Sequence, residues 1–319
     1  MNQQLALGID IGGTNTVFGV VDRRGNLLGE GSMSTKGYEE VTRYIDALYR
    51  KVQPLIEKVG GLDQIRGVGV GAPNGNFYHG TIEFAPNLPW KGVIPLANLI
   101  REQFSMQAVI TNDANAAAIG EMTYGAARGM KDFIMITLGT GLGSGIVANG
   151  QLIYGHDGFA GELGHIIVED EGRLCGCGRY GCLETYASAT GVLRTMEELL
   201  KKKKTDSILR RLPQDQLNSK AICDAAIQGD KLALEAVEYT ARILGKALAN
   251  AIAFTAPEAI ILFGGLTKAG DLLLNPTRKY MDRNVLKIWS GKVKLMRSEL
   301  KESHAAILGA SALVWEMKD

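Results

Sequence analysis

Asp10-Ile11-Gly12-Gly13-Thr14-Asn15 is the stretch that decides the fold, because it joins two apolar runs, 5–11 and 17–22, at a short glycine turn. Two strands joined in this way predict a β-hairpin. Glycines let backbone N–H groups approach an anion closely, and the Thr14 hydroxyl adds a donor. The turn is therefore either a plain hairpin turn or a phosphate-binding site. In the second case, Asp10 is placed to hold a hydrated Mg²⁺ ion.

A second turn of the same kind, Gly139-Thr140-Gly141-Leu142-Gly143, lies between apolar runs at 132–138 and 144–148. Two halves that both begin with a hairpin around a Gly-Thr turn indicate a duplicated unit. Two such turns facing each other can hold the β- and γ-phosphates of a nucleotide. The second turn therefore favours the phosphate interpretation of the first.

Two other nucleotide-binding patterns are excluded. The chain contains no GxxxxGK[ST] motif, which excludes the P-loop class. A GxGxxG pattern occurs at 176–181, but it neither follows a strand nor opens a helix, as a dinucleotide-binding turn requires.

The rest of the pattern predicts an α/β protein. A chain of 319 residues has about the right length for two lobes. Further strands are expected at 27–33, 65–71, 108–111, 259–263 and 293–296. Helices are expected at 38–59, 96–104 and 303–317. The segment that follows residue 182 and runs to 254 is also expected to be mostly helical. We expect a smaller N-terminal lobe of residues 1–118 and a larger lobe of 119–302. The final helix, in 303–319, should pack back on the first lobe.

Composition limits the class of partner. Hydrophobic residues make up 46% and charged residues 22% of the chain, as in ordinary globular proteins. A net charge of +1 gives no overall attraction for nucleic acid or anionic lipid. The sequence shows neither a basic leader before an apolar segment nor an apolar run long enough to span a bilayer. We expect a cytoplasmic protein without nucleic-acid or membrane partners.

Asp113 follows a predicted strand and opens an alanine-rich helix, in the sequence Asn112-Asp113-Ala114-Asn115. One interpretation is simply a capping aspartate. The other is catalytic, because a carboxylate can orient an attacking hydroxyl in phosphoryl transfer. The helix dipole should keep Asp113 ionised and therefore a weak base, which is sufficient for that task.

One histidine and a group of cysteines have metal-ligand spacing. His165, Cys175, Cys177 and Cys182 follow the pattern H-x9-C-x-C-x4-C, which fits a closed tetrahedral Zn²⁺ site. In a cytosolic protein this grouping favours a metal over disulfides, and the alternative is unrelated buried cysteines. The loop would present Glu162, His165 and Glu184 to sugar hydroxyls. Loss of the metal should then weaken sugar binding more than ATP binding.

Taken together, these motifs resemble the ROK family, whose name joins repressors, open reading frames and sugar kinases. The resemblance covers nearly the whole chain and includes, besides the turns, 71–73, 87–90, 112–113, 162–165, 175–184 and 263–265. It implies an actin-like, ribonuclease-H-related ATPase fold with two lobes around a cleft. It also implies a homodimer or a dimer of dimers, with the oligomerisation helices in the larger lobe.

The resemblance implies a role for each matched position. Asp113 is the implied catalytic base. The implied sugar ligands are Asn87, Asn112, Asp113, Glu162, His165 and Glu184. The implied nucleotide site comprises Asp10, Gly12, Gly13, Thr14, Asn15, Thr140, Gly141, Gly264 and Gly265. The implied zinc ligands are His165, Cys175, Cys177 and Cys182.

The expected activity is phosphorylation of a hexose hydroxyl by ATP with Mg²⁺ and a structural Zn²⁺, with glucose converted to glucose 6-phosphate. Kinases of N-acetylmannosamine, N-acetylglucosamine or fructose share most of these motifs, and the family varies around 74–79. The repressors carry a helix-turn-helix domain ahead of the first strand. The strand predicted from Leu5 leaves no segment for one, so a regulator lacking that domain is the remote alternative. An actin-like filament or chaperone ATPase would have no use for the Glu-x-Gly-His motif and zinc loop.

Overall fold

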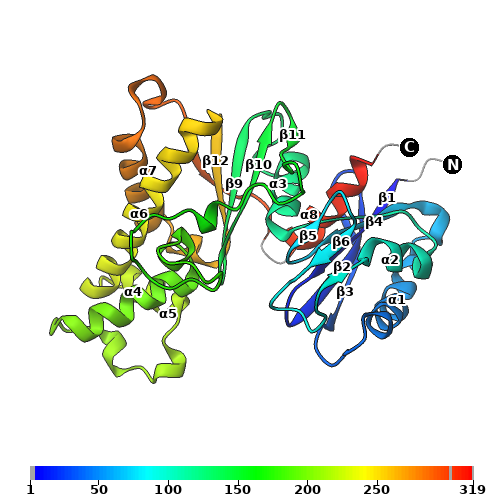
Figure 1. Cartoon of the computed structure of the whole chain (residues 1–319), viewed down its shortest axis with the longest axis horizontal. Coiled ribbons are helices and arrows are strands. Elements are labelled where there is room, and N and C mark those ends of the chain that lie inside the picture. The colour runs from blue at the N-terminus through cyan, green and yellow to red at the C-terminus, as the bar shows by residue number, and fades with distance from the viewer. Residues whose placement is uncertain (1–3, 302–303, 318–319) are drawn as a thin grey trace. The chain divides into compact units, whose positions relative to one another are not determined.

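The computed structural model describes residues 4–301 and 304–317. The chain forms two compact units, shown in Figure 1. The first unit contains Met1–Gly129, Leu152–Ala160 and Glu299–Asp319, and the second contains Met130–Gln151 and Gly161–Ser298. The limit predicted at residue 118 falls within helix α3 (Asp113–Tyr124), whereas the first unit continues to Gly129.

The first unit is built on a five-stranded sheet with the order β3-β2-β1-β4-β8. Its strands are β1 (Leu5–Ile11), β2 (Asn15–Asp22), β3 (Leu27–Ser34), β4 (Ile65–Gly71) and β8 (Ala108–Thr111). β1 and β2 form the predicted hairpin, and β3 extends it to an antiparallel meander. β4 and β8 continue the sheet in parallel with β1. Asp10 pairs with Gly71, and Gly71 with Thr111. The carboxyl ends of these three strands therefore lie at one edge of the sheet.

Successive side chains of β1 point to opposite faces of the sheet, so apolar residues lie on both faces. Helices cover each of them. Leu7 and Ile9 join a core with α1 (Val41–Lys58) and α2 (Leu96–Phe104). On the other face, α8 (Ala305–Trp315) packs on β1 and β4 and contacts α3. A Cβ at Gly69 would collide with the Ala310 carbonyl, so a glycine there permits this close approach. The predicted start of the last helix, residue 303, lies outside the described residues.

A small sheet of three very short strands, β5 (Gly75–Asn76), β6 (Thr81–Glu83) and β7 (Val93–Ile94), belongs to the first unit and was not predicted. Residues 152–160 pack on it. Asn76 Nδ2 donates to the Asp157 carbonyl at 2.8 Å, and the rings of Phe77 and Tyr154 stack with centroids 4.0 Å apart.

The second unit contains a sheet with the order β11-β10-β9-β12-β13. Its strands are β9 (Phe133–Leu138), β10 (Leu142–Ala148), β11 (Gln151–Leu152), β12 (Ala259–Phe263) and β13 (Lys294–Arg297). β9 and β10 form an antiparallel hairpin, and β12 lies parallel to both β9 and β13. Each sheet thus begins with a hairpin and continues with two parallel strands, in agreement with the predicted duplication.

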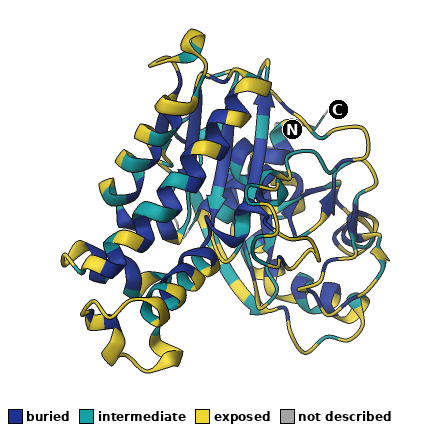
Figure 2. Ribbon diagram, turned by 60° about the vertical axis from the view of Figure 1, so that its left-hand side comes forward, coloured by how far each residue is buried: buried dark blue, intermediate teal, exposed yellow. Residues whose placement is uncertain are grey.

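Helices supply most of the core of the second unit, and they pack on its sheet. Its helices are α4 (Ala189–Lys202), α5 (Ser219–Ile227), α6 (Lys231–Thr255) and α7 (Asp271–Asn284). Short 3₁₀ turns lie at Leu62–Gln64 in the first unit and, in the second, at Leu163–His165, Leu183–Thr185, Ile208–Arg211, Gln214–Gln216, Gly265–Ala269 and Lys287–Trp289. α6 and α7 pack closely because Gly245 has no side chain. A Cβ at this position would collide with the Thr277 carbonyl. Figure 2 shows buried stripes on the helices and largely buried sheets. Among the described residues, no helix combines the length and apolar character needed to cross a membrane.

Candidate active site

Asp10 and Asp113 come together at the carboxyl edge of the first sheet. Asp10 is the penultimate residue of β1, and Asp113 follows β8 by way of Asn112. The Cβ that Gly71 lacks would lie 3.2 Å from Asp10 Oδ1 and 3.9 Å from the Asp113 Cα. The structure thus places the predicted Mg²⁺ carboxylate beside the predicted catalytic carboxylate, with a glycine between them.

Both carboxylates have a raised pKa. Burial, reinforced by the charge of Asp113, raises the pKa of Asp10 to about 7. Desolvation by the surrounding protein also raises the pKa of Asp113. This effect outweighs the hydrogen bond of 2.8 Å from Ala114 N, which lowers the pKa. The Asp113 side chain nevertheless remains accessible to solvent, so a substrate hydroxyl can reach it. When ionised, Asp113 is therefore a stronger base than an ordinary aspartate.

Two expectations about Asp113 need correction. The cap of α3 is Asn112, whose Oδ1 accepts from Asn115 N at 2.7 Å, so Asp113 is the first helical residue. The helix dipole was expected to keep Asp113 ionised and weakly basic, but desolvation dominates and its pKa rises. Asn112 has its oxygen engaged, so Nδ2 is the atom it would offer to a sugar.

The raised pKa of Asp10 predicts a gain in stability when its charge is removed. The stabilising contribution of a raised pKa is complete below the unfolded value of 3.8 and is lost as the pH rises through about 7. We therefore expect Asp10→Asn to raise the Tm of the ligand-free protein by about 2–4 °C near pH 8, and by less near pH 5. Thermal unfolding at both pH values measures this.

Asp22→Asn is the control with the opposite sign. Partial burial opposes ionisation of Asp22, but hydrogen bonds from Asn26 and Arg24 outweigh it and lower the pKa. Its substitution should leave Tm unchanged or reduce it. A lower Tm for Asp10→Asn near pH 8 would show that the charge at this position does not destabilise the fold.

The first turn, Gly12–Asn15, is fixed from two sides. Gly12 N donates to the Asn15 carbonyl at 3.0 Å, and Thr35 N donates to the Thr14 carbonyl at 2.9 Å. A Cβ at Gly13 would lie 2.9 Å from the Asn87 carbonyl oxygen. The first turn therefore packs directly on the backbone of Asn87, which the resemblance assigns to the sugar. Behind the turn, the hydroxyl groups of Thr16, Thr35 and Tyr44 form a buried network.

The second turn, Gly139–Gly143, packs on Glu184. Leu142 N donates to Glu184 Oε2 at 2.9 Å, and a Cβ at Gly141 would collide with the same carboxylate. A Cβ at Gly264, whose φ is 105°, would lie 2.7 Å from the Leu138 carbonyl oxygen. The structure therefore brings Gly264 and Gly265 to the end of β9, next to the second turn.

The predicted zinc ligands form one cluster. One ligand atom each from His165, Cys175, Cys177 and Cys182 lies within 4.8 Å of all the others. Cys177 Sγ is 3.6 Å from Cys182 Sγ, and Cys175 Sγ is 3.7 Å from His165 Nδ1. A sulfur separation of this size is far too long for a disulfide and matches the edge of a tetrahedral Zn²⁺ site. The donor set therefore fits zinc.

His165 turns its other nitrogen toward Glu162. His165 Nε2 lies 3.8 Å from Glu162 Oε2. Ser144 Oγ accepts from Leu163 N at 3.2 Å and donates to the Gly161 carbonyl, which fixes this segment on β10. Nδ1 can thus face a metal while Nε2 is directed by a carboxylate, the usual arrangement around a ligating histidine.

The candidate residues fall into two sets, one in each unit. The first unit holds Asp10, Gly12, Gly13, Thr14, Asn15, Asn87, Asn112 and Asp113. The second holds Thr140, Gly141, Glu162, His165, Glu184, Gly264, Gly265 and the three cysteines of the cluster. Within each unit, the structure brings predicted residues from separate elements into contact.

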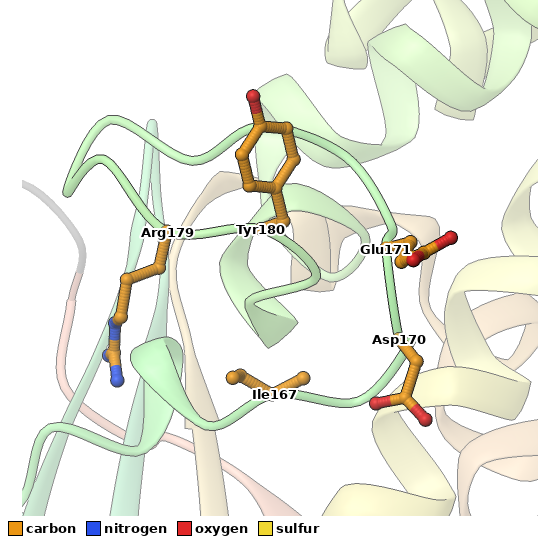
Figure 3. A pocket seen from close by; sticks show the side chains of 5 residues that line it. All are labelled: Ile167, Asp170, Glu171, Arg179 and Tyr180. Carbon is orange, nitrogen blue, oxygen red and sulfur yellow. The ribbon is translucent and has the colours of Figure 1, made fainter.

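A pocket on the loop of residues 162–184, hereafter the cysteine loop, is lined by Ile167, Asp170, Glu171, Arg179 and Tyr180. Figure 3 shows the two carboxylates on one side and the guanidinium group on the other. Ile167 and Tyr180 are 56% and 57% exposed. None of these five side chains is a predicted sugar or nucleotide ligand, although Arg179 Nη2 donates to the His165 carbonyl at 2.7 Å.

Comparison with known proteins agrees with this geometry. The ROK family model matches residues 6–317. A glucokinase of Thermotoga maritima is 34% identical over 315 residues, which cover 97% of both chains. The Escherichia coli DNA-binding transcriptional dual regulator NagC is 33% identical over 274 residues, which cover 86% of this chain and 64% of the regulator. The structure of a ROK family glucokinase from Streptomyces griseus, in complex with glucose and AMPPNP, is 35% identical. It matches 98% of this chain and 100% of that chain with a TM-score of 0.82.

Proposed function

Because the chain belongs to the ROK family, we propose that it is a kinase that transfers the γ-phosphoryl group of ATP to a hexose, with glucose as the acceptor. The predicted family and the actin-like ATPase fold are confirmed by the same matches. The observation that carries the proposal is the meeting of Asp10 and Asp113 at the edge of the first sheet.

Asp113 would act as the general base. Its Oδ1 accepts from Ala114 N, which orients the carboxylate. The sugar hydroxyl would give its proton to the carboxylate as its oxygen bonds to the γ-phosphorus, and the bond from that phosphorus to the bridging oxygen breaks to release ADP. The raised pKa makes Asp113 better able to hold this proton.

Phosphate binding would fall to the two turns and to Asp10. Backbone N–H groups of the first and second turns can donate to phosphate oxygens. Asp10 would hold hydrated Mg²⁺, which neutralises phosphate charge when bound. Asp10 must be ionised to do so, and its pKa of about 7 therefore predicts weaker Mg²⁺ binding as the pH falls below that value.

The residues proposed for sugar binding occur in each unit. Asn87 is held beside Gly13, Asn112 would offer Nδ2, and the cysteine loop would offer Glu162, His165 and Glu184. Zinc at the cluster would fill all its coordination positions with protein ligands and leave none for substrate, so it would support the loop rather than the chemistry.

A panel of acceptors tests the choice of sugar. ADP release should be measured with ATP, Mg²⁺ and each of glucose, fructose, N-acetylglucosamine and N-acetylmannosamine. We expect kcat/KM for glucose to exceed that for either N-acetylhexosamine by about tenfold or more, because the acetamido group must be accommodated as extra volume. A higher value for an N-acetylhexosamine would replace glucose as the acceptor while leaving the kinase assignment in place.

A sugar-responsive regulator is the alternative that the match to NagC keeps open. Binding of glucose without turnover would support it, whereas turnover would exclude a purely regulatory role. The proposal includes a cytoplasmic location, where ATP is abundant and cysteines stay reduced. It also includes a homodimer or dimer of dimers, which light scattering of the purified protein can test.

A further inference from the structure

The start of helix α4 holds the second turn by its carbonyl groups. Ala189 N donates to the Gly139 carbonyl at 2.9 Å, and Thr190 Oγ1 donates to the Thr140 carbonyl at 2.9 Å. The described residues contain no cis peptide bond, and in a planar trans peptide the N–H points opposite to the C=O. The N–H groups of Thr140 and Gly141 are therefore directed away from α4.

The start of α4 is in turn joined to the cysteine loop. The 3₁₀ turn Leu183–Thr185 directly follows the ligand Cys182, and Thr185 donates to the Cys182 carbonyl from both N, at 3.0 Å, and Oγ1, at 2.8 Å. Ser188, the cap of α4, donates from Oγ to the Glu184 carbonyl at 2.7 Å. A movement of Cys182 would therefore be passed to the residues that hold the second turn.

Arg173 provides a second connection between the same two segments. It lies in the cysteine loop between His165 and Cys175, and its side chain is only 12% exposed. The Nη1 group donates to the carbonyls of Thr185 at 2.7 Å and Gly191 at 3.1 Å. Its remaining partners are Thr195 Oγ1 at 3.0 Å, Glu198 Oε1 at 2.9 Å and the face of the Tyr186 ring. Such a planar set of donors is specific to arginine.

We propose that Arg173 and Thr190 are positioning residues through which the cysteine loop holds the second turn in its ATP-binding orientation. The proposal rests on the proposed kinase function. It assigns to the loop a role toward the nucleotide in addition to its expected role toward the sugar.

Thr190 gives the sharper test, because its hydroxyl can be removed at nearly constant volume. Thr190→Val should weaken binding of a non-hydrolysable ATP analogue about five- to tenfold, the ratio expected for one hydrogen bond of ordinary net strength. The affinity for glucose should stay unchanged. Thr190→Ser, which keeps the hydroxyl, should restore nucleotide affinity. Calorimetric titration of the full-length protein with each ligand separately measures both affinities.

A double-variant cycle tests the connection to Arg173. Arg173→Lys keeps the charge but loses the planar donors, and it should weaken binding of the ATP analogue while zinc content stays unchanged. If the connection runs through Thr190, the effects of Arg173→Lys and Thr190→Val on nucleotide affinity should be less than additive. Full additivity would overturn the link.

Two matched controls separate this link from general destabilisation. Thr255 Oγ1 donates to the Ala251 carbonyl, and Arg278 Nη2 donates to the Leu295 carbonyl, in other parts of the second unit. Thr255→Val and Arg278→Lys should leave nucleotide affinity unchanged. Equal nucleotide affinity in wild type and Thr190→Val would overturn the inference even if the protein phosphorylates sugar. Absence of sugar turnover, with nucleotide affinity still dependent on Thr190, would instead overturn only the proposed function.

Discussion

Replacement of Asp113 by asparagine is expected to lower kcat by a factor of about 10³ while sugar affinity changes little. The asparagine amide keeps the shape of the side chain but cannot accept the hydroxyl proton. Because orientation and proton acceptance are required mainly in the transition state, kcat should carry nearly the whole effect. Steady-state kinetics together with direct titration of glucose separates the two quantities.

Asp63→Asn is a suitable control for this variant. Asp63 is an exposed aspartate in the first turn of the short 3₁₀ helix Leu62–Gln64, in the same unit as Asp113. Its substitution should leave kcat within about a factor of two, as expected for a surface position away from the site. Near-normal turnover by Asp113→Asn would remove Asp113 from the role of base.

The second large effect is expected from Cys177→Ser. Wild-type protein should contain about one zinc ion per chain, and the variant should lose it because a serine hydroxyl is a poor replacement for a thiolate ligand. We expect KM for glucose to rise about 10- to 100-fold, since Glu162, His165 and Glu184 are carried by the same loop. Elemental analysis and steady-state kinetics give the two readouts.

The structure changes what is expected for ATP in this variant. The sequence suggested that loss of the metal would leave ATP binding closer to normal. Glu184, however, lies between the cluster and the second turn, with Oε1 3.7 Å from Cys175 Sγ and with Oε2 accepting from Leu142 N. KM for ATP should therefore rise as well, although less than KM for glucose.

Cys223→Ala is the control for Cys177→Ser, because Cys223 is buried in the helical core and lies outside the cluster. This variant should retain zinc and an unchanged KM for both substrates, whatever its effect on Tm. Wild-type protein prepared without chelators that holds no zinc, or a Cys177→Ser variant with an unchanged KM for glucose, would contradict the assignment of the cluster.

Much of the fold was predictable because the central strands are largely apolar runs between clear turns. The limits predicted for 5–11, 65–71, 108–111 and 259–263 agree with β1, β4, β8 and β12. The helix predicted from residue 38 begins only at Val41. Strands β5, β6 and β7 were missed because two or three residues are too few to show a period.

The candidate site was predictable in its residue types but not in its energetics. The short motifs around Asp113 and the cysteines specify local geometry, and the structure brings those residues together. The raised pKa of Asp113 could not be read from the sequence, because it depends on how strongly the folded protein desolvates the carboxylate. Arg173 was also missed, since most of its partners are main-chain carbonyls and hydroxyls with no sequence signature.

The most direct test of the account is the fate of the γ-phosphate. The purified protein should be incubated with glucose, Mg²⁺ and ATP that carries an isotopic label in its γ-phosphate, and the products identified by mass spectrometry. We expect labelled glucose phosphate in amounts equal to the ADP released, and almost none with Asp113→Asn. Labelled inorganic phosphate without sugar phosphate, or no turnover with any hexose of the panel, would contradict it.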